Sequence, residues 1–291
     1  MKKLISIVLI FILIISVSGC FKKDDLEGAT IYTTVYPISY ITNVLYGQNS
    51  EIKSIYPSGT NPNEYSLTQK QIEEYSKGDI FIYNGLSNEK QIAKNFLNKN
   101  KKLRILDVAY GLKYNYSEEE LWLSPSNFLM LASTIRTNLT DFIENKYLVE
   151  DINNNYKELE EEISIMDAEL RNIGTNATND GTNTIVVSSN VFKFLDNYGF
   201  HIISLEDEEN LTTNNLTSIR SNFKNKKYTT IFMTDIDEKT ELINSLVENY
   251  DAKIVNVSTM YTLSEDNIVN GDNYISIMND FIENIRNVTL G

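Results

Sequence analysis

A long apolar stripe in the middle of the chain constrains the fold more than any other feature. Apolar residues recur there at steps of three and four, the spacing of one face of an α-helix. The stripe consists of Leu148, Ile152, Tyr156, Leu159, Ile163, Met166, Leu170 and Ile173. A single helix over residues 147–173 would be about 40 Å long, enough to run along two lobes. A coiled-coil dimer seam is the alternative, but so short a stripe in mid-chain favours docking within the same molecule.

Strands and helices alternate on both sides of this helix. Runs rich in β-branched and aromatic residues predict four strands before it, at residues 30–36, 51–56, 79–83 and 104–108. Similar runs predict four strands after it, at residues 184–188, 200–205, 228–233 and 253–257. Helical stretches between the strands imply parallel pairing with right-handed crossovers. The predicted fold class is α/β, with two lobes that each hold a mostly parallel four-stranded sheet flanked by helices, joined by one long backbone helix.

The lobe boundaries follow from this pattern. Residues 29–146 are predicted to form the N-terminal lobe, residues 147–173 the linking helix and residues 174–291 the C-terminal lobe. Residues 174–182 are rich in Asn, Thr and Gly, so they are predicted to be a loop that leads into the second lobe. Thr68, followed by a glutamine three residues later, predicts a capping box at the start of a helix.

The N-terminus has the pattern of a secretory signal. Two lysines precede an apolar run from Leu4 to Val17, and the small residues Ser18 and Gly19 lead to Cys20. The run is short for a membrane span, which needs about 20 apolar residues. An ordinary membrane anchor with an incidental cysteine is the alternative interpretation.

The segment around Cys20 resembles a bacterial lipobox. This resemblance implies removal of residues 1–19 and attachment of a diacylglyceryl group to the Cys20 thiol, with residues 20–28 as a lipidated tether. The protein is then expected at the outer face of the bacterial cytoplasmic membrane, held there by its lipid.

Composition excludes several classes of partner and chemistry. The 291 residues carry 40 acidic and 26 basic side chains, for a formal charge of −14, so a nucleic-acid partner is not expected. One cysteine and one histidine exclude an internal disulfide and argue against a Cys/His zinc cage. The sequence contains neither a glycine-rich phosphate loop nor a G-x-S-x-G elbow. We therefore predict that the protein is not an enzyme.

Four ordered motifs resemble those of the metal-specific ABC-transporter binding lipoproteins, the zinc and manganese carriers also called adhesin lipoproteins. Residues 56–68 (YPSGTNPNEYSLT) resemble V-P-x-G-x-x-P-H-x-Y-E-P-T, and residues 79–85 (DIFIYNG) resemble A-D-L-x-x-x-x-G. Residues 121–125 (LWLSP) resemble the end of H-x-W-L-S/D-P, and residues 187–199 resemble S-H-x-x-F…Y-G. The resemblance runs through residues 30–290.

This resemblance implies a monomer that binds a small ligand in a cleft between its lobes. It also implies delivery of that ligand to the permease and ATPase of a metal ABC transporter. A surface lipoprotein that keeps the fold but has lost transport, and acts as an adhesin or binds a non-metal ligand or a protein, is the alternative.

The chain departs from the family at the positions that hold metal. The family uses a histidine in the first motif, a histidine before x-W-L, a histidine or acid in the second lobe and an aspartate after the last strand. The matching positions here are Asn63, Glu120, Ser189 and Ser258. These are oxygen donors with one carboxylate, whereas zinc favours imidazole and thiolate, and hard ions need several carboxylates. The predicted site is degenerate, with weak divalent-metal binding or another ligand.

Other polar residues near the strand ends have weaker claims. Asp235, Asp237, Glu206 and Asp207 could add carboxylates, although a solvated acidic rim is the favoured interpretation. The sole histidine, His201, is predicted to be a structural residue of a strand, because it matches none of the ligand positions.

The lipobox predicts the behaviour of a cysteine variant. Cys20→Ala should accumulate as uncleaved precursor or appear as unacylated protein, and metabolic palmitate label should disappear because its attachment site is gone. Gel mobility and label incorporation measure both effects. Label that persists in the variant would contradict acylation at Cys20.

Overall fold

The computed structural model describes residues 24, 26–206 and 211–291. The predicted signal, Cys20 and most of the predicted tether lie outside the described residues. Within the described part of the chain, no helix is both long enough and apolar enough to cross a membrane.

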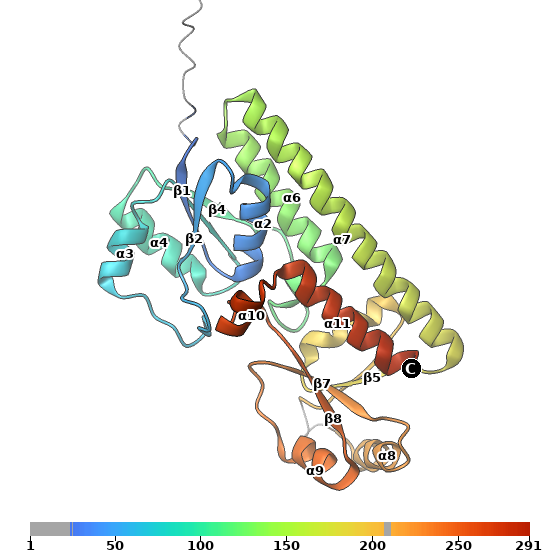
Figure 1. Ribbon diagram of the computed structural model, residues 1–291. Coiled ribbons are helices and arrows are strands. Elements are labelled where there is room, and N and C mark those ends of the chain that lie inside the picture. Colours follow the sequence, from blue (N-terminus) through green and yellow to red (C-terminus); the bar gives the residue numbers. More distant parts are fainter. Residues whose placement is uncertain (1–23, 25, 207–210) are drawn as a thin grey trace, which may run out of the picture.

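The N-terminal lobe is built on a parallel four-stranded sheet (Figure 1). Its strand order is β2-β1-β3-β4, and register pairs such as Ile31 with Ile80 fix the neighbours. The strands are β1 (Ala29–Thr33), β2 (Ser50–Ser54), β3 (Ile80–Tyr83) and β4 (Arg104–Asp107). The helices between them are α2 (Tyr36–Tyr46), α3 (Gln69–Tyr75) and α4 (Glu89–Lys99). The capping box predicted at Thr68 is present at the start of α3.

The C-terminal lobe repeats this arrangement with the order β6-β5-β7-β8, again all parallel. Its strands are β5 (Thr184–Val187), β6 (His201–Ser204), β7 (Thr230–Thr234) and β8 (Lys253–Val257). Its helices are the 3-10 helix η1 (Asn190–Tyr198), α8 (Thr213–Lys224), α9 (Glu241–Tyr250) and α10 (Glu265–Asn270). The predicted α/β fold class and the eight predicted strands are confirmed, with end points that differ by up to three residues.

Four further helices complete the described chain: α5 (Glu120–Leu123), α6 (Pro125–Phe142), α7 (Lys146–Asp180) and α11 (Tyr274–Thr289). The long helix α7 packs on α2 and α6 of one lobe and on η1 and α11 of the other (Figure 1). All eight residues of the apolar stripe are buried. The stripe is therefore docked within the molecule, as predicted.

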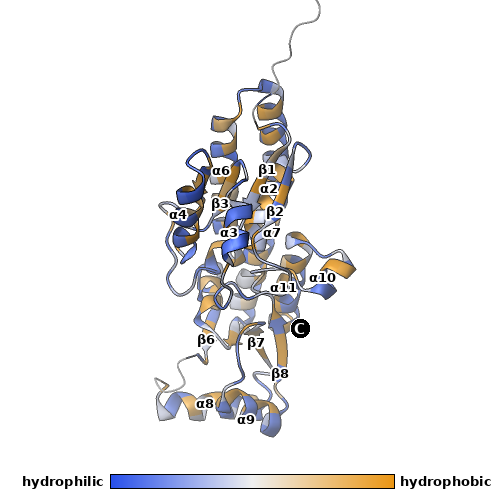
Figure 2. Ribbon diagram, turned by 90° about the vertical axis from the view of Figure 1, so that its left-hand side faces the viewer, coloured by the Kyte–Doolittle hydropathy of each residue, from blue (hydrophilic) through white to orange (hydrophobic). Residues whose placement is uncertain are grey.

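The hydrophobic core is continuous between the lobes. One buried cluster contains Ile31 and Ile82 of the first sheet together with Ile185 and Val187 of the second. Helix α3 is hydrophilic and has no buried residue, whereas α2 and β8 carry hydrophobic residues (Figure 2).

Aromatic residues seal the junction between the N-terminal lobe and α11. The rings of Phe128 and Tyr274 stack with their centroids 3.8 Å apart, and the Tyr274 hydroxyl donates to the Trp122 carbonyl oxygen at 2.6 Å. The Trp122 indole N–H donates to the carbonyl oxygen of Thr259, just beyond β8, at 2.8 Å. These side chains fix one lobe against the other.

The predicted loop over residues 174–182 is wrong. Helix α7 continues through Gly174 to Asp180 and ends where Gly181 adopts a left-handed conformation with φ of 72°. The Thr178 hydroxyl bonds the carbonyl oxygen four residues earlier, inside the helix. Gly174 reflects close packing rather than a turn, because a Cβ atom there would lie 1.9 Å from the Tyr198 carbonyl oxygen.

This contact predicts an unusual effect of a helix-favouring substitution. Gly174→Ala gains about 1 kcal/mol of helix propensity, but it forces α7 away from Tyr198 at an overpacking cost of about 1–3 kcal/mol. We therefore expect lower stability in denaturant unfolding. The exposed neighbour Asn176→Ala is the control and should be neutral or slightly stabilising. A stabilised Gly174→Ala protein would contradict the close helix contact.

Candidate functional site

The loops at the carboxyl ends of the two sheets meet between the lobes. Residues beyond β8 bond the loop beyond β2: the Gly59 N–H donates to the Leu263 carbonyl oxygen at 3.0 Å, and the Thr262 hydroxyl donates to the Thr60 carbonyl oxygen at 3.1 Å. The Tyr36 N–H, at the start of α2, donates to the Tyr261 carbonyl oxygen at 2.9 Å. In open α/β sheets this edge is the usual place for a ligand.

A pocket of about 360 Å³ lies at this meeting point. One wall comes from the loop beyond β2 and the other from the loops beyond β7 and β8. It is lined by Gly59, Thr60, Asn61, Asp235, Ile236, Ser258, Thr259, Tyr261, Thr262, Ser264 and Asn267. Its polar lining is rich in oxygen and carries one ionisable carboxylate, Asp235.

Tyr261 is the centre of the hydrogen bonding beside this pocket. Its hydroxyl donates to a Glu119 carboxylate oxygen at 2.5 Å and lies 3.4 Å from a Glu118 oxygen. The Asn63 side-chain amide donates to the same hydroxyl at 3.3 Å. Because Tyr261 comes from the C-terminal lobe and the other three come from the N-terminal half, these bonds join the two halves of the site.

A second layer of buried polar groups continues into the N-terminal lobe. The Asn84 side-chain amide donates to Glu118 at 2.8 Å, while the Asn84 backbone N–H donates to Glu89 at 2.8 Å. The Tyr56 hydroxyl also donates to Glu89, at 3.3 Å. Three acidic side chains, Glu89, Glu118 and Glu119, are thus connected through neutral donors and Tyr261.

Burial changes the ionisation of these carboxyl groups. It raises the pKa of Glu89 to about 8 and that of Glu118 to about 7, with neighbouring carboxylates adding to both shifts. Burial also raises the pKa of Glu119, and the Asp237 charge adds to that shift, while the Tyr261 hydrogen bond opposes it. One Glu119 carboxylate oxygen is buried without a hydrogen-bond partner among the described residues. A proton or a cation would satisfy this oxygen.

The four positions predicted from the family motifs have four different surroundings. Only Asn63 contacts the Tyr261 cluster. The buried Glu120 carboxylate accepts backbone N–H groups of residues 115–117, including Tyr116 at 2.6 Å. Ser189 caps η1 and donates to Glu206 at 3.2 Å. Ser258 lines the pocket and donates to Asp235 at 3.1 Å.

The acids at the ends of the second-lobe strands mainly bind the loops that follow neighbouring strands of the same sheet. Asp235 accepts the N–H and hydroxyl of Thr259 at 2.9 and 2.8 Å, and Asp237 accepts the Ser188 hydroxyl at 2.6 Å. Glu206 accepts the Ser189 hydroxyl, and Asp207 lies outside the described residues. His201 is an exposed residue at the start of β6, at the opposite end of the strand from the site.

Glu118, Glu119 and Tyr261 were missed by reasoning from sequence. The motif H-x-W-L drew attention to Glu120, the third of three consecutive acids. In the structure Glu120 begins α5 and turns toward the preceding loop, so the two earlier acids face Tyr261. A run of three acids that ends two residues before the only tryptophan was the available signal.

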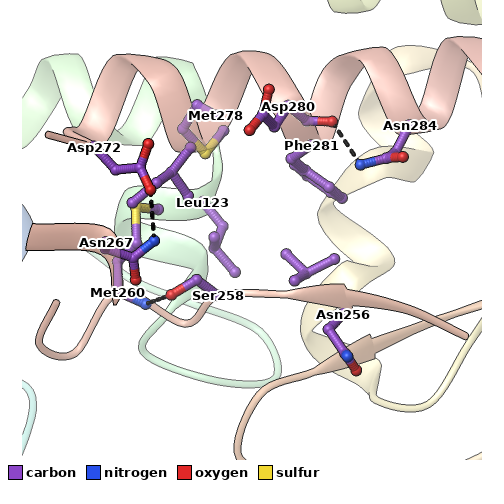
Figure 3. A pocket seen from close by; sticks show the side chains of 12 residues that line it. Leu123, Asn256, Ser258, Met260, Asn267, Asp272, Met278, Asp280, Phe281 and Asn284 are labelled. Carbon is purple, nitrogen blue, oxygen red and sulfur yellow. Dashed lines mark hydrogen bonds between the residues drawn. The ribbon is translucent and has the colours of Figure 1, made fainter. Parts of the chain in front are cut away.

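A smaller pocket of about 170 Å³ lies between α11 and β8 (Figure 3). Leu123, Met278 and Phe281 give it an apolar wall, and it shares Ser258 and Asn267 with the larger pocket. Its polar side chains are largely paired with groups around it, as in the 2.9 Å bond from Asn267 to Asp272. It is small for an organic ligand, and pockets for those usually exceed about 300 Å³.

The side chains that could bind a metal ion are spread out in the described part of the chain. Among the residues that the structure describes, no group of three or more His, Cys, Asp and Glu side chains is arranged to hold a metal ion. The site offers separate oxygen donors rather than a preformed metal cage.

Comparison with known proteins gives a consistent result. The chain matches the ZnuA family, described as the periplasmic zinc-uptake complex component A, over residues 31–288. The zinc-binding lipoprotein AdcA of Streptococcus pneumoniae is 23% identical, with 99% of this chain and 61% of AdcA aligned, so the chain spans less than two thirds of that relative. The metal ABC transporter substrate-binding lipoprotein FimA of Streptococcus parasanguinis is 25% identical over 96% of both chains.

Solved structures show the same fold. The zinc-bound ZnuA-like domain of Streptococcus pneumoniae AdcA superposes with a TM-score of 0.70 at 21% identity, covering 90% of this chain and 98% of that domain. The metal-dependent lipoprotein YcdH of Bacillus subtilis gives a TM-score of 0.74 at 18% identity, covering 90% and 100%.

The buried carboxyl groups predict a pH dependence of stability. Since the Glu118 pKa rises from 4.5 to about 7 on folding, folding takes up a proton between these pH values and stability falls as pH rises through them. Glu118→Gln should flatten this fall by no more than about 3 kcal/mol while keeping an acceptor for Asn84. Exposed Glu158→Gln is the control. If the stability of wild type and of Glu118→Gln, measured by melting at each pH, changed in parallel across this range, the pKa shift would be contradicted.

Proposed function

This chain belongs to the family of the zinc-uptake complex component A, ZnuA, and from that membership we propose that it is a lipid-anchored solute-binding protein of a metal-type ABC transporter. It works outside the cytoplasmic membrane and passes its ligand to a permease driven by an ATPase. It performs no catalysis of its own.

One observation carries the proposal: loops from the carboxyl ends of both sheets close on the same polar pocket, with Tyr261 bonded to Glu119 across the lobes. A solute-binding protein needs a site that both lobes complete, because the ligand then senses and stabilises their relative position. The pocket has this property, since Asn61 comes from one lobe and Ser258 from the other.

The donor set supports weak binding of zinc and manganese. The site offers carboxylates, amides and hydroxyls, and the sole histidine lies at the far end of β6. Zinc prefers nitrogen and sulfur donors. Manganese accepts oxygen donors, but tight binding of a hard cation needs several carboxylates together, and the described residues do not group them. The Asp235 carboxylate in the pocket lining favours a cationic ligand over an anion. The site is therefore degenerate with respect to the histidine-based site of the family.

This proposal predicts the response to zinc. A carrier with nanomolar Kd gains about 5 kcal/mol in tens of micromolar zinc, which raises Tm by several degrees. We expect this chain to show much less stabilisation by Zn²⁺ or Mn²⁺, because it lacks imidazole ligands in the cleft. Thermal melting and calorimetry on the mature chain measure the effect.

Matched glutamine variants make the zinc test sharper. Glu119→Gln removes the buried carboxylate that accepts the Tyr261 hydroxyl beside the pocket, and Glu120→Gln removes its sequence neighbour, which binds the preceding loop. Submicromolar zinc binding by wild type, lost in Glu119→Gln and kept in Glu120→Gln, would overturn the degenerate-site proposal. It would show that this carboxylate has replaced the histidines.

Transport needs a separate experiment. Crosslinking of the lipidated protein in native membranes should recover a permease, and cells that lack the protein should take up less of its ligand. Recovery of no permease, with unchanged uptake of a panel of divalent cations, would favour the surface lipoprotein that has lost transport.

A further inference from the structure

The first described residue is anchored at one end of the molecule. The Asp24 carboxylate is 8% exposed and accepts the backbone N–H groups of Glu144 at 2.7 Å and Asn145 at 2.8 Å, in the turn between α6 and α7. It also accepts the Leu26 N–H at 3.0 Å. Burial opposes its ionisation, but these three donors outweigh burial and hold its pKa below the ordinary value.

The following residues strengthen this anchor. The Leu26 side chain is fully buried, and the Tyr46 hydroxyl donates to its carbonyl oxygen at 3.0 Å. The chain then enters β1 directly. Asp24 and Leu26 are therefore fixed to the folded body beside the α6–α7 turn.

Little chain remains between this anchor and the lipid. Cys20 precedes Asp24 by four residues, which span at most about 14 Å when fully extended. A diacylglyceryl group on Cys20 places that residue at the headgroup level of the bilayer. Of the expected tether, residues 20–28, only the first four residues therefore precede the first residue that is bound to the folded body.

The α6–α7 end also presents a residue suited to a membrane surface. Tyr147, in the first turn of α7, is 74% exposed and lies two residues after Asn145. Tyrosine is enriched where membranes meet water, because its ring is apolar and its hydroxyl is polar. The adjacent Lys146 is exposed as well and can reach lipid phosphates.

From these observations we propose that the short tether holds the α6–α7 end of the molecule against the lipid bilayer, with Tyr147 at the headgroup level. This inference rests on the lipid anchor of the proposed function. Helix α7 has 35 residues and is about 50 Å long, and it runs from this end toward the C-terminal lobe (Figure 1). Helices α8 and α9 then lie at the end of the molecule away from the bilayer.

The test places a tryptophan at each end. Tyr147→Trp reports on the α6–α7 end and exposed Glu248→Trp on α9, while the native Trp122 is fully buried and gives a constant background. Lipidated proteins are reconstituted in phosphatidylcholine vesicles that contain a headgroup spin-labelled lipid as quencher. Because the headgroup layer is only about 5–8 Å deep, we expect about tenfold greater quenching at position 147. Equal quenching at both positions, or stronger quenching at 248, would overturn the proposal.

A linker variant tests the role of the tether. Insertion of about 20 Gly/Ser residues between Lys23 and Asp24 adds a mean reach of roughly 25 Å. Quenching of Tyr147→Trp should then fall severalfold, and unchanged quenching would overturn the role of the short tether.

Vesicle flotation separates a failed anchor from a failed orientation. If the protein does not float, the lipid anchor of the proposed function is wrong. The orientation is still measurable then, because Cys20 is the only cysteine and couples specifically to a maleimide lipid in the same vesicles.

Discussion

Burial of one face of α7 against both lobes is the interaction on which the rest of the structure depends. Its stripe residues belong to the same hydrophobic cluster as the inner residues of both sheets. Separating the lobes would expose this shared surface at about 25 cal/mol per Å² of apolar area. The stacked Phe128 and Tyr274 add a further contact at the junction, between α6 and α11. The cleft is therefore largely preformed, and only small lobe movements can accompany ligand binding.

A fixed junction explains how the site can contain two buried acids, Glu89 and Glu119, beside the partly buried Glu118. Burying ionised carboxylates is costly unless each finds a partner, so such groups shift their pKa or pair instead. Here Asn84, Tyr56 and Tyr261 supply neutral hydrogen-bond donors. The Trp122 bond to Thr259 helps to hold the loop beyond β8 that brings Tyr261 to the acids. The same contacts that join the lobes thus also supply the hydrogen bonds of the buried acids.

The sequence predicted what depends on periodicity. Strand positions and the α7 stripe follow from spacing along the chain, so local patterns were sufficient. The α7 end and the cleft acids depend on contacts between distant segments. Gly174 looks like a loop residue until its neighbour Tyr198 is placed beside it. Glu120 matched a motif position, but its carboxylate is used by the loop before α5, and no spacing rule could reveal that.

The contrast between Glu119 and Glu120 bears on the proposal that the site differs from the histidine-based site of the family. The turn of α5 positions Trp122, and any residue two places earlier lies at the start of that turn. A carboxylate there finds backbone N–H groups at 2.6–3.3 Å, which satisfy it without a metal. Its neighbour Glu119 then meets Tyr261 and keeps one oxygen unpaired. Trp122 and α7 hold the fold independently of the residues at these positions, so the proposed change of donors does not disturb it.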